Sequence, residues 1–148
     1  MSPRGKQSAV IPELSAEEKN EVSRVFVDDK ELISLAQRLG QEAQKGNLKT
    51  SQLRAVFGEV RRIEMMLADE SKQQQAWYRL RLLEPKMLYR AARKESSSEG
   101  LRKLTAYLKE ALRYVLEASS QERPERFQRF VDFMEAVVAY HKAAGGGD

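Results

Sequence analysis

Apolar residues recur at three- and four-residue steps between positions 48 and 68, and this period constrains the fold more than any other feature of the chain. The series is Leu53, Val56, Phe57, Val60, Ile63 and Leu67. At about 100° per residue, these positions form one stripe along a helix. Thr50, Arg54 and Arg61 lie beside the stripe. The segment therefore predicts one long amphipathic helix with a basic flank.

The basic flank of this helix has two interpretations. Arg54 and Arg61 are seven residues apart, so at about 1.5 Å rise per residue they stand roughly 10 Å apart along one side. Two guanidinium groups with Gly58 between them suit a phosphate backbone that lies close against the helix. The alternative is a solvated rim, because arginine often flanks the apolar stripe of an ordinary helix.

Composition narrows the classes of protein. A chain of 148 residues, 41% hydrophobic and 32% charged, fits one helix-rich domain. The sequence has no cysteine and one histidine, so we expect no disulfide, no metal site and no cofactor. No apolar run approaches the roughly 20 residues of a membrane span. The first residues lack the apolar core of a secretory signal, so we expect a cytoplasmic protein without a membrane partner.

Positive charge is concentrated in the middle of the chain. Residues 49–94 hold 11 basic and 5 acidic side chains, whereas the segments on either side each carry a net charge of −1. This asymmetry favours an anionic partner for one part of the surface. A solvated helical face is the competing explanation.

The patterns predict an all-α single-domain bundle of about five or six helices. The expected helices cover residues 15–26, 29–46, 50–68, 85–94, 98–118 and 124–141. Residues 69–76 are predicted to be a loop or a frayed helix end, and 77–82 a helix or an ordered connector. A flexible tail is expected over 1–12, the helical domain over 13–142, and a flexible glycine-rich tail over 143–148.

Local signals set the expected boundaries of these helices. Ser15 with Glu18 resembles a capping box, and Ser98 can cap the helix that follows it. Gly46 and Asn47 tolerate the left-handed conformation in which helices often end. Thr50 or Ser51 is the expected N-cap of the basic helix. Pro85 suits the first turn of a helix, where its missing N–H costs nothing.

A second basic group is expected on the helix that begins at Pro85. Lys86, Tyr89, Arg90 and Arg93 share one side at three- and four-residue spacing. An aromatic ring can stack on an exposed base while neighbouring cations hold phosphate. The alternative is that Tyr89 covers the edge of the core while the arginines pair with acidic helices.

The last helix has an unusually wide apolar arc. Phe133 and Tyr140 lie beside the main stripe, which predicts either deep burial or a subunit interface. His141 falls within the stripe, and no nucleophile and acid are placed beside it. We therefore interpret it as a structural histidine rather than a general base, and expect no catalysis.

Three segments in this order and spacing resemble a known family. They are residues 48–60, 83–93 and 127–142, the last of which ends in Ala139-Tyr140-His141-Lys142. Together they resemble the small α-helical subunit of type III-A CRISPR effector (Csm) complexes, over roughly residues 28–142.

The resemblance implies a small helical protein without nuclease activity. Copies of such a subunit stack into a minor filament beside the backbone subunits, contact the large subunit, and line the channel where target RNA pairs with the CRISPR RNA. The RNA-binding residues predicted from pattern and resemblance together are Lys49, Thr50, Ser51, Arg54, Arg61, Lys86, Tyr89, Arg90 and Arg93. The residues predicted for a subunit interface are Phe133, Tyr140, His141 and Lys142. The alternative function is a protein adaptor whose basic flank docks acidic partners.

Overall fold

The computed structural model describes residues 11–94 and 97–147, and this part of the chain forms six α-helices, one short 3-10 helix and no strand. The elements are α2 (Ala16–Arg24), α3 (Asp29–Lys45), α4 (Thr50–Leu67), η1 (Glu70–Lys72), α5 (Gln73–Ala92), α6 (Glu99–Leu116) and α7 (Arg123–Ala143). The prediction of an all-α single domain is confirmed. Most of the predicted N-terminal tail lies outside the described residues.

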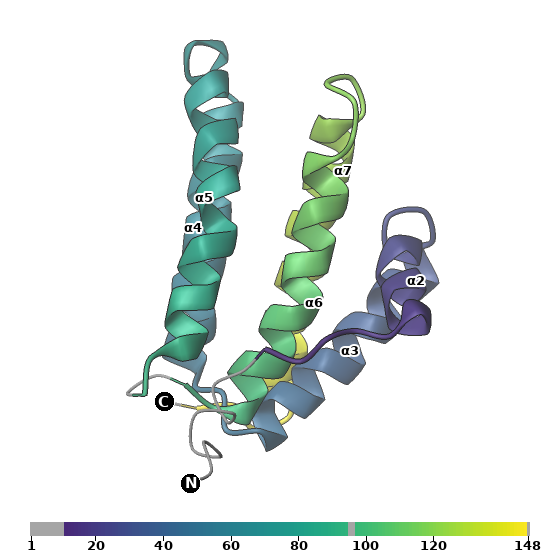
Figure 1. Cartoon of the computed structure of the whole chain (residues 1–148), viewed down its shortest axis with the longest axis vertical. Coiled ribbons are helices and arrows are strands. Elements are labelled where there is room, and N and C mark those ends of the chain that lie inside the picture. Colours follow the sequence, from purple (N-terminus) through teal and green to yellow (C-terminus); the bar gives the residue numbers. More distant parts are fainter. Residues whose placement is uncertain (1–10, 95–96, 148) are drawn as a thin grey trace, which may run out of the picture.

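The helices form a bundle from which one helical hairpin, made of α4 and α5, protrudes. α4 and α5 run side by side and stand next to the α6–α7 pair, while α2 and α3 cover the other side of that pair (Figure 1). α3 packs mainly against α7, α4 packs against α7, and α5 packs against α6. We call the end of the bundle where α3, α4 and α7 meet its base. The turn between α4 and α5, which contains η1, lies at the opposite end of the hairpin (Figure 1).

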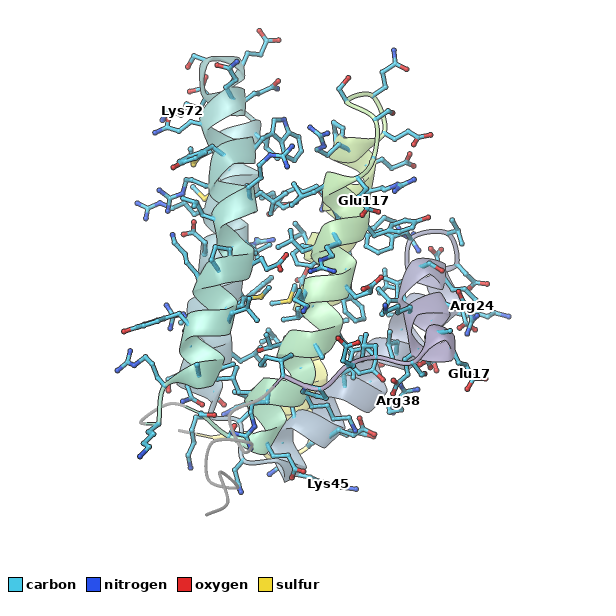
Figure 2. The ribbon with its side chains drawn as sticks, in the orientation of Figure 1. Glu17, Arg24, Arg38, Lys45, Lys72 and Glu117 are labelled. Carbon is cyan, nitrogen blue, oxygen red and sulfur yellow. The ribbon has the colours of Figure 1, made fainter. Side chains whose placement is uncertain are left out.

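One continuous core lies on both sides of the α6–α7 pair, against α2 and α3 on one side and against the hairpin on the other. Figure 2 shows side chains filling the space that separates these helices. Near the far end of the hairpin, the Trp77 ring packs edge-on against Phe127, with ring centroids 5.9 Å apart. The Arg123 guanidinium lies over the same indole, 5.6 Å from its centroid. These contacts fasten α5 to the start of α7.

The caps expected at Ser15, Ser98 and Gly46 are present. The Ser15 hydroxyl accepts a hydrogen bond from the Glu18 amide at 3.1 Å, and the Glu18 carboxylate accepts one from the Ser15 amide at 2.7 Å. The Ser98 hydroxyl accepts from the Leu101 amide at 3.1 Å. Gly46 is the C-cap of α3, and Asn47 adopts the left-handed conformation with φ 68°. These bonds satisfy amides that the first turn of a helix leaves without partners.

One predicted helix start and one predicted N-cap are wrong. α5 begins at Gln73 rather than at Pro85, so residues 73–82 are helical and only η1 interrupts the chain after α4. Pro85 removes one backbone hydrogen bond, to the carbonyl of Arg81. Both residues are exposed, so water can reach that carbonyl. The N-cap of α4 is Lys49 rather than Thr50 or Ser51.

Gly100 and Gly40 allow helices to approach closely at the base. The Gly100 amide donates to the Gly46 carbonyl at 2.9 Å, and a Cβ on Gly100 would lie 2.4 Å from the Ala43 carbonyl oxygen. The end of α3 and the start of α6 could not meet in this way with any larger residue. Gly40 plays the same part where α3 crosses α7.

A polar network ties α2 to α3 and α6. The Arg38 guanidinium donates to both oxygens of Glu21, at 2.6 and 2.9 Å, and to the Tyr107 hydroxyl at 3.2 Å. The Tyr107 hydroxyl donates to Glu18 at 3.2 Å. The bonds from Arg38 hold the pKa of Glu21 below its ordinary value, whereas burial raises the pKa of Tyr107.

Acid should weaken this network through Glu21. Its pKa is lowered in the folded chain, so its contribution to stability is present above the ordinary value of 4.5 and is lost as pH falls through the lowered value. We expect Glu21→Gln to lower the free energy of unfolding at pH 7 by about 1 kcal/mol, since the pair is partly exposed. The difference from the parent should shrink towards pH 3. Urea denaturation at both pH values measures this, with exposed Glu17→Gln as control; an equal difference at both would contradict it.

Candidate nucleic-acid interface

The outer face of α4 carries the basic residues predicted from its period. Leu53, Val56, Val60 and Ile63 point inwards and are buried. Arg54, Gly58, Arg61, Arg62 and Met65 are exposed on the opposite side. The stripe therefore belongs to the core and leaves the cationic side of the helix for solvent or a partner.

The arginines of α4 differ in their contacts. Arg61 pairs with Glu64 at 3.1 Å and lies over the Phe57 ring, 5.7 Å from its centroid. Within the residues that the structure describes, Arg54 and Arg62 have no carboxylate partner. The predicted pair of Arg54 and Arg61 is thus one unpaired cation and one that is partly neutralised.

The structure brings the four predicted residues of α5 together. Lys86, Tyr89, Arg90 and Arg93 line one open cavity of about 530 Å³, along with Leu82 and Pro85. Tyr89 is 65% exposed, so its ring does not cover the core. The Arg93 guanidinium lies 5.7 Å from the centroid of that ring. An exposed aromatic flanked by cations is the arrangement that suits a base with its phosphate.

A groove of about 330 Å³ separates α4 from α5 on the same face. Its cationic residues are Arg62 from α4 and Lys86 and Arg90 from α5. Sequence reasoning missed Arg62, because the apolar stripe alone does not say which side of a helix a neighbour will occupy. The docking of α5 makes position 62, one residue past Arg61, part of the groove.

Among its described lining residues, the groove also contains one carboxylate. Glu59 is held by the Arg79 guanidinium in two bonds, at 2.8 and 3.0 Å, and Lys86 lies 3.9 Å from it. The bonds to Glu59 raise the pKa of Arg79 above its ordinary value. Because Arg79 already neutralises this carboxylate, the remaining charge of the groove is positive.

The predicted residues around the start of α4 differ in their exposure to solvent. Lys49 and Ser51 are exposed. Thr50 is buried, and its amide donates to the Gly147 carbonyl at 3.2 Å. The predicted placement of the Thr50 side chain at an RNA-facing edge is therefore corrected, because this side chain is buried within the domain.

The predicted subunit interface is not one surface. Phe133 and His141 are each only 1% exposed, so their side chains cannot contact another subunit while the domain is folded as it is here. Tyr140 packs partly buried against the core. Lys142 is exposed and donates to the Gly146 carbonyl at 3.3 Å. The wide apolar arc of α7 is explained by burial, because α3, α4 and α6 all pack against this helix.

His141 serves the backbone of the fold. Its Nε2 lies 2.7 Å from the Leu48 carbonyl oxygen, and because a carbonyl can only accept, this nitrogen carries the proton. Gly146 packs against the ring, and a Cβ there would lie 2.3 Å from it. The imidazole is thus enclosed by the α3–α4 connection and the C-terminal segment.

The described residues contain no cluster of three or more histidine, cysteine or acidic side chains that could hold a metal ion. None of their helices is both long and apolar enough to cross a membrane.

Fold and surface together define a small all-α protein with a basic helical hairpin. The family model Csm2 Type III-A matches residues 27–147, and the chain belongs to this family. Its members are small, structural subunits of the type III-A CRISPR effector complex. Neither curated proteins nor solved structures give a match. The resemblance found in the sequence is confirmed.

Replacing the buried His141 should lower the free energy of unfolding. His141→Leu removes the bond to the Leu48 carbonyl and leaves that oxygen without its partner, which costs about 1–3 kcal/mol. Urea denaturation followed by circular dichroism measures the change. Lys142→Ala, at the exposed neighbouring position, should change stability by less than about 0.5 kcal/mol. Equal stability of the two variants would contradict the structural role of His141.

Proposed function

We propose that this chain is a non-catalytic small subunit of a type III-A CRISPR ribonucleoprotein, which binds the backbone of the guide–target RNA duplex through the outer face of α4 and α5. Copies of the chain stack in the minor filament beside the backbone and large subunits, in the cytoplasm. Family membership supports the place in the complex. The distribution of paired and unpaired charge supports the surface.

The hairpin cations without a carboxylate partner are the observation that carries the proposal. Away from the hairpin, several arginines are held by carboxylates of the same chain. These pairs are Arg24–Glu31, Arg38–Glu21, Arg126–Glu122 and Arg129–Asp29. On the hairpin, Arg54, Arg62 and Arg81 lack such a partner among the described residues. Unpaired cations on two adjacent helices favour an anionic ligand from outside the chain.

The shape of the face suits a nucleic-acid backbone rather than base recognition. Adjacent packed helices lie about 8–10 Å apart, so cations from α4 and α5 form a broad strip. Phosphate contacts of this kind fix the position of a duplex without reading its sequence. In an RNA-guided complex, base pairing with the guide supplies the sequence specificity, and the protein holds the duplex by its shape and backbone.

A protein adaptor is the alternative function. Met65 is 74% exposed and Tyr78 is 62% exposed, both on the hairpin. Large apolar side chains in solvent are common at protein contacts. If the chain is an adaptor, its basic face binds acidic helices of a partner protein, and RNA does not displace that partner.

RNA binding by the purified full-length chain distinguishes the RNA-binding function from the adaptor function. We expect weak, sequence-indifferent binding to a double-stranded RNA, measured by fluorescence anisotropy over a range of salt. Each lost phosphate contact lowers the slope of log K against log[salt] by about 0.7–0.9. Arg54→Ala with Arg61→Ala should therefore reduce the slope by about 1.5 and the affinity by at least about tenfold at low salt.

A second double variant controls for net charge. Lys19→Ala with Lys30→Ala removes two positive charges from α2 and α3, which pack against neither α4 nor α5. It should change affinity and slope much less. Equal effects of the two double variants, or no salt-dependent binding by the parent chain, would contradict the proposed RNA-binding face.

A further inference from the structure

Gly58 is a glycine that its own fold does not require. A Cβ on Gly40 would lie 2.8 Å from the Tyr140 Cβ, and one on Gly100 would lie 2.4 Å from a carbonyl oxygen. A Cβ on Gly58 would have no neighbour within 4 Å. A glycine in the middle of a helix destabilises it by roughly 0.5–1 kcal/mol relative to alanine. Nothing inside the described chain offsets this cost.

The surroundings of Gly58 indicate what approaches it. Gly58 forms part of the groove between α4 and α5, and Arg62, Lys86 and Arg90 line the same groove. The one carboxylate among the described lining residues, Glu59, is held by Arg79. A bare stretch of helix surface thus lies among cations from both helices.

We propose that this groove is the binding site for one phosphodiester group of an RNA strand, and that the missing side chain at Gly58 lets the strand lie directly against α4. Arg62 presents a planar guanidinium that can donate two bonds to the phosphate oxygens, and Lys86 supplies a point charge from α5. A side chain at position 58 would keep the strand away from these donors. The inference rests on the proposed RNA-binding function and gives that surface a defined centre.

The site differs from the one that the sequence pattern suggested. Arg61 lies over Phe57 and pairs with Glu64, so it stands on the side of α4 away from the groove. Arg62 lies on the α5 side, where Gly58 is open. The phosphate is therefore held between two helices rather than along the flank of one.

Substitutions at Gly58 separate ligand binding from folding. Gly58→Ala and Gly58→Leu should be at least as stable as the parent in thermal denaturation, because the position is open and both residues favour helix. The parent's affinity for a double-stranded RNA of arbitrary sequence should fall at least about tenfold in Gly58→Leu, and less in Gly58→Ala. Ala139→Leu adds similar bulk to an exposed position of α7 and should leave affinity unchanged.

Arg62→Ala completes a double-mutant cycle. Alone it should weaken binding and lower the salt slope by about 0.7–0.9. Combined with Gly58→Leu it should add little, because both changes remove the same contact. If the parent binds RNA and Gly58→Leu binds equally well, the groove is not the site, although the proposed function stands. If the parent shows no RNA binding, the proposed function fails and this inference fails with it.

Discussion

The hydrogen bonds at the base of the bundle, where α3, α4 and α7 meet, fix the orientation of the hairpin and of its basic face. His141 donates to the Leu48 carbonyl in the turn between α3 and α4, and the C-terminal segment closes over the ring at Gly146. The Gly147 carbonyl then accepts from the Thr50 amide, the first residue of α4. A buried bond between a side chain and the main chain is costly to leave unmade, so it favours a single geometry. The direction in which α4 leaves the bundle follows from it.

This geometry explains why part of the positive charge of the hairpin has no carboxylate partner within the described chain. Elsewhere, helices cross so that arginines meet carboxylates, as Arg38 meets Glu21 and Arg129 meets Asp29. The hairpin touches the bundle along its inner side only, and its outer side faces no other element of the described chain. Exposed cations on such a face cost little in stability because water solvates them. They remain available to a ligand that provides negative charge.

Local signals in the sequence were sufficient for most of the fold. Capping residues such as Ser15 and Ser98 act within one turn, so their roles can be predicted without knowing the tertiary structure. Pro85 misled the prediction because a proline is tolerated inside a helix when the carbonyl it leaves unpaired faces solvent. That condition depends on which side of α5 is buried, and a sequence pattern does not contain it.

The candidate site was predictable in part for the same reason. The period placed Arg54 and Arg61 on the exposed side of α4, and the spacing of Lys86, Tyr89, Arg90 and Arg93 put them on one side of α5. Neither pattern could say that Arg62 would face α5, since this depends on how two helices dock. The buried environment of Phe133 and His141 likewise follows from three helices packing on α7, which no single stripe reveals.

The chain's single tryptophan lies where the hairpin meets the bundle. Trp77 contacts Phe127 and lies beneath Arg123, both from α7. Its indole emission depends on that environment, so intrinsic fluorescence from the unmodified protein reports directly on the junction of α5 and α7. Any ligand or neighbouring subunit that swings the hairpin away from α7 would expose this ring to water and shift its emission to longer wavelength.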